Sequence, residues 1–93
     1  MKEIGEITRI SRNPAILVAE VDSETVMMSI AAGRYYGLDE MGTVIWRRID
    51  PPCSFGELVD GLAADYEADR ATIAFDVRAL LDRMLQEDVV RID

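Results

Sequence analysis

The hydrophobic positions divide this chain into a strand-rich first half and a helical second half. In the first half, short apolar runs rich in β-branched side chains are separated by polar or glycine-containing breaks, which is typical of strands joined by tight turns. The second half places apolar residues three or four positions apart, as amphipathic helices do. We therefore predict a three-stranded antiparallel meander over residues 15–38, with strands at 15–21, 24–30 and 34–38.

The second of these strands shows the clearest alternation. After a polar break at Asp22 and Ser23, the apolar residues Val26, Met28 and Ile30 fall two positions apart. Successive side chains of a strand point to opposite faces, so these three share one face. We expect that face to be buried against the rest of the protein.

Three helices are predicted to follow over residues 39–88, each beginning at a recognisable cap. Asp39 precedes the first, Ser54 and Glu57 form a Ser-x-x-Glu capping box for the second, and Asp69 precedes the third and longest. The apolar side chains that we expect to face the core are Met41, Val44, Ile45, Trp46, Ile49, Phe55, Leu58, Val59, Leu62, Tyr66, Ile73, Val77, Leu80, Leu81, Met84 and Leu85.

The two ends of the chain carry weaker patterns. Residues 1–14 are expected to form a leading strand or an ordered arm, and residues 88–92 a short closing strand. The predicted fold class is α+β and winged helix-turn-helix-like, with a three-stranded antiparallel sheet followed by three helices. At 93 residues we expect residues 1–93 to be a single domain.

Charge and composition exclude several classes of function. The formal net charge of −8 argues against a nucleic-acid partner, which needs clustered Lys and Arg, and against anionic membranes. A winged helix could place its third helix in DNA, but there Arg70, Arg78 and Arg83 are opposed by more numerous acidic residues. With no long apolar run and no signal-peptide core, we expect a cytoplasmic protein.

We also expect no catalytic residues, cofactor or metal. The chain has no histidine, so nothing of that type activates its one cysteine, Cys53, or offers the usual zinc ligand. No glycine-rich phosphate-binding motif is present, and the spacing of the carboxylates is that of solvated helix faces and caps. A binding protein therefore fits the sequence better than an enzyme.

The third strand is the best candidate for a binding site. It is short and polar, and it ends the meander, so one of its edges should have unpaired backbone groups. Tyr35 and Tyr36 are adjacent and must point to opposite faces, so only one can join the core. Which tyrosine faces inward is left open by the sequence.

Segment 33–46 resembles the PqqD-like family of precursor-peptide recognition elements. It begins Gly-Arg-Tyr-Tyr-Gly-Leu-Asp-Glu-Met-Gly and ends with Ile45-Trp46. The resemblance extends over residues 15–92, through the segment 54–62 and the leucine-rich third helix. It implies a protein that binds the leader segment of a ribosomally made precursor peptide as an added antiparallel strand on the third strand, against the third helix.

As a chain not fused to an enzyme, it is most similar to the free-standing recognition protein of lasso-peptide biosynthesis. That likeness implies a leader peptidase and a macrolactam synthetase as partner enzymes; the peptide chaperone of pyrroloquinoline quinone (PQQ) biosynthesis is the alternative. The peptide-binding residues expected from the open edge and the resemblance are Arg34, Tyr35, Tyr36, Gly37, Leu38, Phe75, Asp76, Ala79, Leu80 and Arg83.

Overall fold

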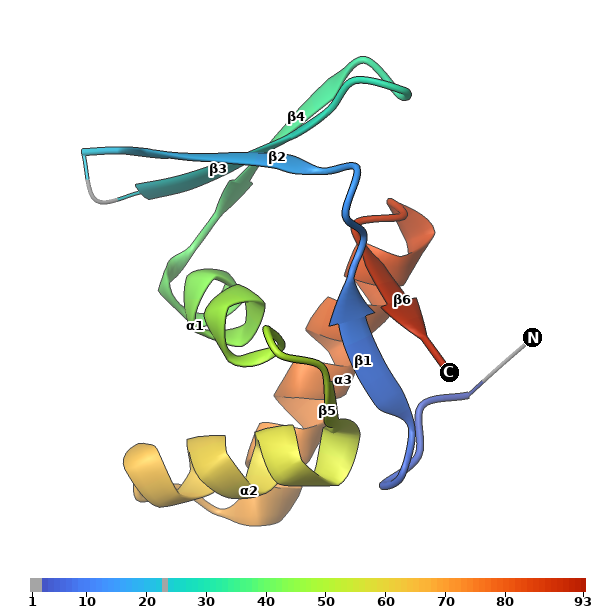
Figure 1. Cartoon of the computed structure of the whole chain (residues 1–93). Helices are drawn as coiled ribbons and strands as arrows, with labels where there is room; N and C mark the ends of the chain where they lie inside the picture. The colour runs from blue at the N-terminus through green and yellow to red at the C-terminus, as the bar shows by residue number, and fades with distance from the viewer. Residues whose placement is uncertain (1–2, 23) are drawn as a thin grey trace.

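The computed structural model of this chain describes residues 3–22 and 24–93, so Met1, Lys2 and Ser23 lie outside the described residues. Its first sheet has the strand order β2 (Leu17–Val21), β3 (Glu24–Ser29) and β4 (Arg34–Leu38), with both pairs antiparallel. This confirms the predicted meander, and Figure 1 shows it at one end of the molecule.

A second three-stranded sheet joins the two ends of the chain. Its central strand is β1 (Arg9–Arg12), which pairs with β5 (Cys53–Ser54) on one side and with β6 (Val90–Ile92) on the other. A closing strand was predicted, and a leading strand was one of two alternatives for residues 1–14, but their pairing and the short strand β5 were not predicted. Local sequence patterns do not predict pairing between residues about 80 positions apart, such as Ser11 and Arg91.

The three predicted helices are present as α1 (Glu40–Arg48), α2 (Phe55–Asp65) and α3 (Arg70–Gln86). Each begins where its cap predicted. The Asp39 carboxylate accepts a hydrogen bond from the Gly42 amide at 2.7 Å, and the Asp69 carboxylate accepts one from the Thr72 amide. The capping box of α2 is complete, because the side chains of Ser54 and Glu57 each bond the other's backbone amide.

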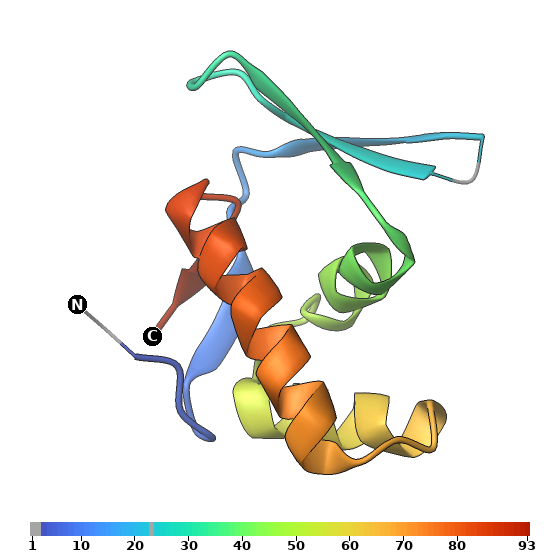
Figure 2. The same cartoon turned by 180° about the vertical axis from the view of Figure 1, so that it is seen from behind.

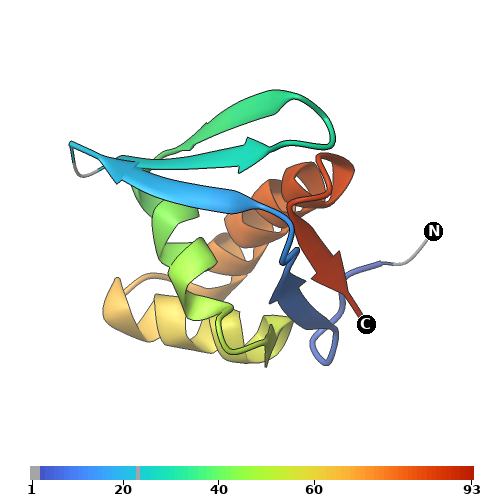
Figure 3. The same cartoon turned by 45° about the horizontal axis from the view of Figure 1, so that its top comes forward.

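The core lies where the helices meet the two sheets. Figure 3 shows the β2–β3–β4 sheet above α1 and the C-terminal end of α3, with β1 and β6 at the side. Tyr66 was expected in this core but is 43% exposed, because α2 ends at Asp65 and Tyr66 is its C-cap. The buried apolar residues are Ile4, Ile10, Met27, Ile45, Trp46, Ile49, Phe55, Leu58, Val59, Leu62, Ile73, Val77, Leu81, Met84, Val89 and Val90.

The prediction for the buried face of β3 was wrong. The buried side chains are Thr25, Met27 and Ser29, whereas Ile30 is 70% exposed. Val26 and Met28 lie on the other face, where the register places Met28 between Leu17 of β2 and Tyr35 of β4. Only one face of this sheet is covered by helices, and the apolar residues of the outer face pack across the strands against one another instead.

Phe55 and Phe75 form a matched pair for testing this core. Phe55 is fully buried, while Phe75 on α3 is 75% exposed. We expect Phe55→Ala to lower the free energy of unfolding by about 3–5 kcal/mol through lost burial and the cavity left behind. We expect Phe75→Ala to change it by less than about 0.5 kcal/mol. Urea unfolding followed by circular dichroism measures both; equal effects would contradict this packing.

Candidate functional site

The outer edge of β4 has no strand partner among residues 3–22 and 24–93. β4 pairs with β3 alone, and the two segments that could have covered its other edge, β1 and β6, bond to each other in the second sheet. Figure 2 shows β4 running down toward α1 with α3 beside it. The backbone groups of Arg34–Leu38 that point away from β3 are therefore available to another chain.

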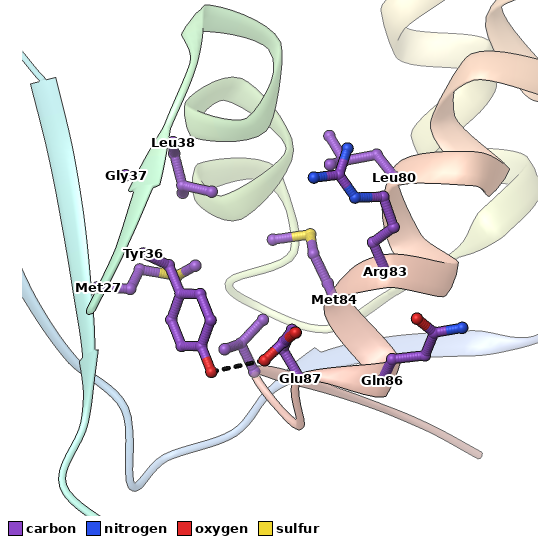
Figure 4. A pocket seen from close by; sticks show the side chains of 10 residues that line it. Met27, Tyr36, Gly37, Leu38, Leu80, Arg83, Met84, Gln86 and Glu87 are labelled. Carbon is purple, nitrogen blue, oxygen red and sulfur yellow. Dashed lines mark hydrogen bonds between the residues drawn. The ribbon is translucent and has the colours of Figure 1, made fainter. Parts of the chain in front are cut away.

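A cavity of about 200 Å³ lies between β4 and α3 and distinguishes this edge from the opposite edge of the sheet. Among the described residues β2 also pairs only with β3, but it contributes none of those that line this cavity. Figure 4 shows the side chains converging from the strand and from the helix, and among them Met27 and Met84 are buried whereas Arg83 is exposed. The lining residues are Met27, Tyr36, Gly37, Leu38, Leu80, Arg83, Met84, Gln86, Glu87 and Val89.

Tyr36, and not Tyr35, is the tyrosine that faces inward. Its ring lines the cavity and packs against the core cluster. Tyr35 is 71% exposed on the outer face of the sheet, opposite Met28. The alternation of side chains along a strand produces this division, so the question that the sequence left open is answered by which face the helices cover.

A polar bridge connects β4 to the C-terminal end of α3. The Tyr36 hydroxyl donates a hydrogen bond to Oε2 of Glu87 at 2.7 Å, and Nη1 of Arg34 donates to the same oxygen at 2.9 Å. Glu87 is the C-cap residue of α3. Two donors from β4 thus hold one carboxylate of the helix end, which fixes the separation of strand and helix at one end of the cavity.

The bridge shifts the titration of its members. The hydrogen bond from Tyr36, followed by the charge of Arg34, lowers the pKa of Glu87. The bond to Glu87, followed by burial, raises the pKa of Tyr36. The pKa of Arg34 is raised by its contacts with Tyr36 and Glu87. Near neutral pH the bridge therefore holds an ionised carboxylate, a neutral phenol and a guanidinium.

The structure brings together about half of the residues predicted for the site. Tyr36, Gly37, Leu38, Leu80 and Arg83 line the cavity, and Arg34 lies at its end through Glu87. Four others are not among the lining residues, and they are Tyr35, Phe75, Asp76 and Ala79.

Phe75 shows why some of the predicted residues do not line the cavity. At 100° per residue on a helix, Phe75 lies about 140° around α3 from Leu80, so the two cannot both point at β4. The lining residues that the sequence analysis missed are Met27, Met84, Gln86, Glu87 and Val89. Met84 and Glu87 follow Leu80 by four and seven residues, so helical periodicity counted from Leu80 would have found them. Met27 was missed because the wrong face of β3 was expected to be buried.

Other chemistry has little support in the part of the chain that the structure describes. No three His, Cys, Asp or Glu side chains gather there in a way that could hold a metal ion. None of its helices is both long and apolar enough to cross a membrane. Burial raises the pKa of the Cys53 thiol, which donates to the Arg48 carbonyl oxygen, so the thiol is kept in its protonated and less nucleophilic form.

Comparison with known proteins gives relatives in sequence and in structure. A "PqqA binding protein" of Rhodopseudomonas palustris (strain ATCC BAA-98 / CGA009) is 37% identical over 60 residues, which are 64% of this chain and 59% of that protein. The chain thus matches little more than half the length of this curated relative.

Two solved structures are similar over nearly the whole chain. One is TbiB1 in complex with the TbiA(beta) leader peptide, with a TM-score of 0.79, 30% identity, and coverage of 87% of this chain and 94% of that one. The other is a lasso peptide synthetase B1 complexed with a leader peptide, with a TM-score of 0.77 and coverage of 88% and 96%. At 24% identity the second likeness shows a shared fold.

The match to a family model covers a longer stretch of sequence than the curated relative does. The model of the family described as coenzyme PQQ synthesis protein D (PqqD) matches residues 24–90, from the start of β3 to the start of β6. That match includes β4, α3 and the cavity between them. The chain therefore belongs to the PqqD family.

Proposed function

We propose that this protein binds the leader segment of a ribosomally synthesised precursor peptide by adding it as a strand to β4. The observation that carries the proposal is an unpaired strand edge beside an apolar cavity. The backbone of Arg34–Leu38 would bond the guest main chain, which tolerates many sequences. Alternate guest side chains would point toward α3 and enter the cavity, which selects among sequences.

The bridge between Tyr36 and Glu87 makes the groove ready before the guest arrives. Because strand and helix are already held together at one end, binding orders the guest more than it orders the protein. A flexible leader must lose conformational freedom on binding, which reduces the net affinity. We expect dissociation constants between about 10 nM and 10 μM.

The client pathway we favour is lasso-peptide maturation. TbiB1, a structural relative at 30% identity, was solved with a leader peptide, and a second relative of the same fold is a lasso peptide synthetase B1. In this role the protein would present the bound precursor to a separate leader peptidase and a macrolactam synthetase. It would act by binding and leave the chemistry to these enzymes.

A role in PQQ biosynthesis is the alternative, and the PqqA binding protein at 37% identity favours it. The two roles differ in the peptide that is bound. Titrating the protein with fluorescently labelled TbiA(beta) leader and with labelled PqqA separates them, because the client peptide should bind at least about tenfold more tightly than the other.

Strand addition predicts a particular response to changes in the guest backbone. The test uses the peptide that binds most tightly among those selected from a displayed library of random 12-residue sequences. Its backbone nitrogens are methylated one at a time. We expect about five- to tenfold losses of affinity at alternate positions, where an amide bonds β4, and little change at the positions between them. Fluorescence anisotropy measures the dissociation constant of each methylated peptide.

The intervening positions are the matched control, because they carry the same modification on the edge that faces away from β4. A flat profile along the peptide would contradict strand addition. Failure of the library to yield any specific binder would contradict the proposed function as a whole.

The bridge predicts a change in titration when one hydroxyl is removed. Tyr36→Phe deletes the largest cause of the lowered Glu87 pKa, so that pKa should rise toward the ordinary value of 4.5. In the wild type, the bridge stabilises the folded protein fully at pH values above 4.5, the ordinary pKa of a glutamate. This stabilisation is lost as the pH falls through the lowered pKa of Glu87. NMR titration of the Glu87 side-chain carboxyl carbon measures the shift. Tyr35→Phe is the control and should leave the pKa of Glu87 unchanged. An equal pKa of Glu87 in the wild type and in Tyr36→Phe would show that the bridge is absent.

A further inference from the structure

Arg83 is an exposed, positively charged residue that lines the cavity. Within the described parts of the chain, residues 3–22 and 24–93, its guanidinium makes no ion pair and no hydrogen bond, although it lines the cavity. By contrast, Arg34 at the opposite end is bound to Glu87. Arg9 and Arg91 are also exposed and make no ion pair among the described residues, but neither lines the cavity, so it is the position of Arg83 that distinguishes it.

The nearest acidic residues do not account for Arg83. Glu87 is one helical turn away, but its Oε2 already accepts from both Tyr36 and Arg34, and Arg83 is the least of the influences on its pKa. Asp76 lies seven residues earlier, about 10 Å along the helix axis. Asp82 is the adjacent residue, and adjacent side chains on a helix do not face each other.

The two ends of the cavity differ in charge, because Arg83 lies at one end and Glu87 at the other. Figure 4 shows Arg83 rising beside Leu80, with its guanidinium on the side of the cavity that faces Leu38. Glu87 lies at the other end, where Tyr36 is bound to it. Between them lie Met84 and the other apolar groups of the cavity. An occupant with an apolar side chain in the middle would therefore meet a free positive charge at one end.

We infer that the guest peptide carries an acidic side chain two residues from the apolar side chain that fills the cavity, and that Arg83 binds its carboxylate. The inference rests on the proposed strand addition, since residues two apart on a strand point to the same face, about 6.6 Å from one another. That spacing brings the second side chain to the rim of a cavity whose centre the first one occupies. Arginine suits the role because its planar guanidinium can donate two parallel hydrogen bonds to one carboxylate.

The contact should contribute to specificity and depend on salt. Once the guest strand covers the groove, water has less access to the ion pair than on an open surface, so the pair should exceed an ordinary exposed salt bridge. We expect loss of the guest carboxylate to weaken binding about tenfold at low salt, and less at high salt.

The experiment is a selection followed by a double-mutant cycle. A displayed library of random 12-residue peptides is selected against the wild type, Arg83→Gln and Arg91→Gln. Arg91 is a matched control, because it is an exposed arginine on β6 that lines no part of the cavity. The best wild-type peptide and its Asp→Asn or Glu→Gln counterpart are then titrated against all three proteins and against Arg83→Lys.

Wild type and Arg91→Gln should enrich Asp or Glu two positions from an apolar residue, and Arg83→Gln should keep the apolar preference and lose the acidic one. Neutralising the peptide should cost about tenfold with wild type and almost nothing with Arg83→Gln, and Arg83→Lys should retain part of the difference. Enrichment of apolar residues alone would overturn this inference and leave strand addition standing. Absence of any enriched peptide would overturn both.

Discussion

The arrangement of this site depends on one contact, the hydrogen bond from the Tyr36 hydroxyl to Glu87 with Arg34 on the same oxygen. It joins the last strand of the sheet to the end of the longest helix. Apart from this contact, β4 is held by its pairing with β3, by the packing of Tyr36 and Leu38 against the core, and by the chain that continues into α1. With this contact, strand and helix form two walls at a fixed separation, which places the open strand edge beside the cavity, as the proposed strand addition requires.

The second sheet is the other condition for an open site. The tail of the chain could have been the missing neighbour of β4, but β6 is paired with β1, and Asn13 reinforces that placement. The Asn13 side chain donates to the Asp88 carbonyl oxygen at 2.7 Å, and its backbone amide donates to the Val89 carbonyl oxygen. Because Val89 lines the cavity, the same contacts hold one of its walls in place.

The elements of the fold were largely readable from the sequence, because they depend on local signals. The caps at Asp39, Ser54 and Asp69 are short-range hydrogen bonds, so residue types at fixed spacing predict them. The alternation of β3 was also visible, but its interpretation was wrong, since Val26 and Met28 are apolar on a face that no helix covers. Which face is covered is a tertiary property, and the pairing of β1 with β6 is another.

The residues that line the cavity were predicted only in part for the same reason. The open edge at Arg34–Leu38 follows from the order of the strands, and Leu80 and Arg83 line the cavity from the facing helix. Finding that Tyr36, and not Tyr35, lines the cavity required knowledge of which face of the sheet is covered. Finding that Phe75 does not line it required knowledge of the rotation of α3 about its axis. Helical periodicity from Leu80 could have placed Glu87 on the facing side of α3, but its bond to Tyr36, 51 residues earlier in the chain, has no local signal.

Amide hydrogen exchange across the β2–β3–β4 sheet tests the central claim most directly. The protein is compared by NMR alone and saturated with a peptide selected from the random library. We predict that outward-pointing amides within Arg34–Leu38 exchange at least about tenfold more slowly in the complex, while the amides of the opposite edge, Leu17–Val21, exchange as before. Protection of the β2 edge, or unchanged exchange throughout β4 with the peptide bound, would contradict the account.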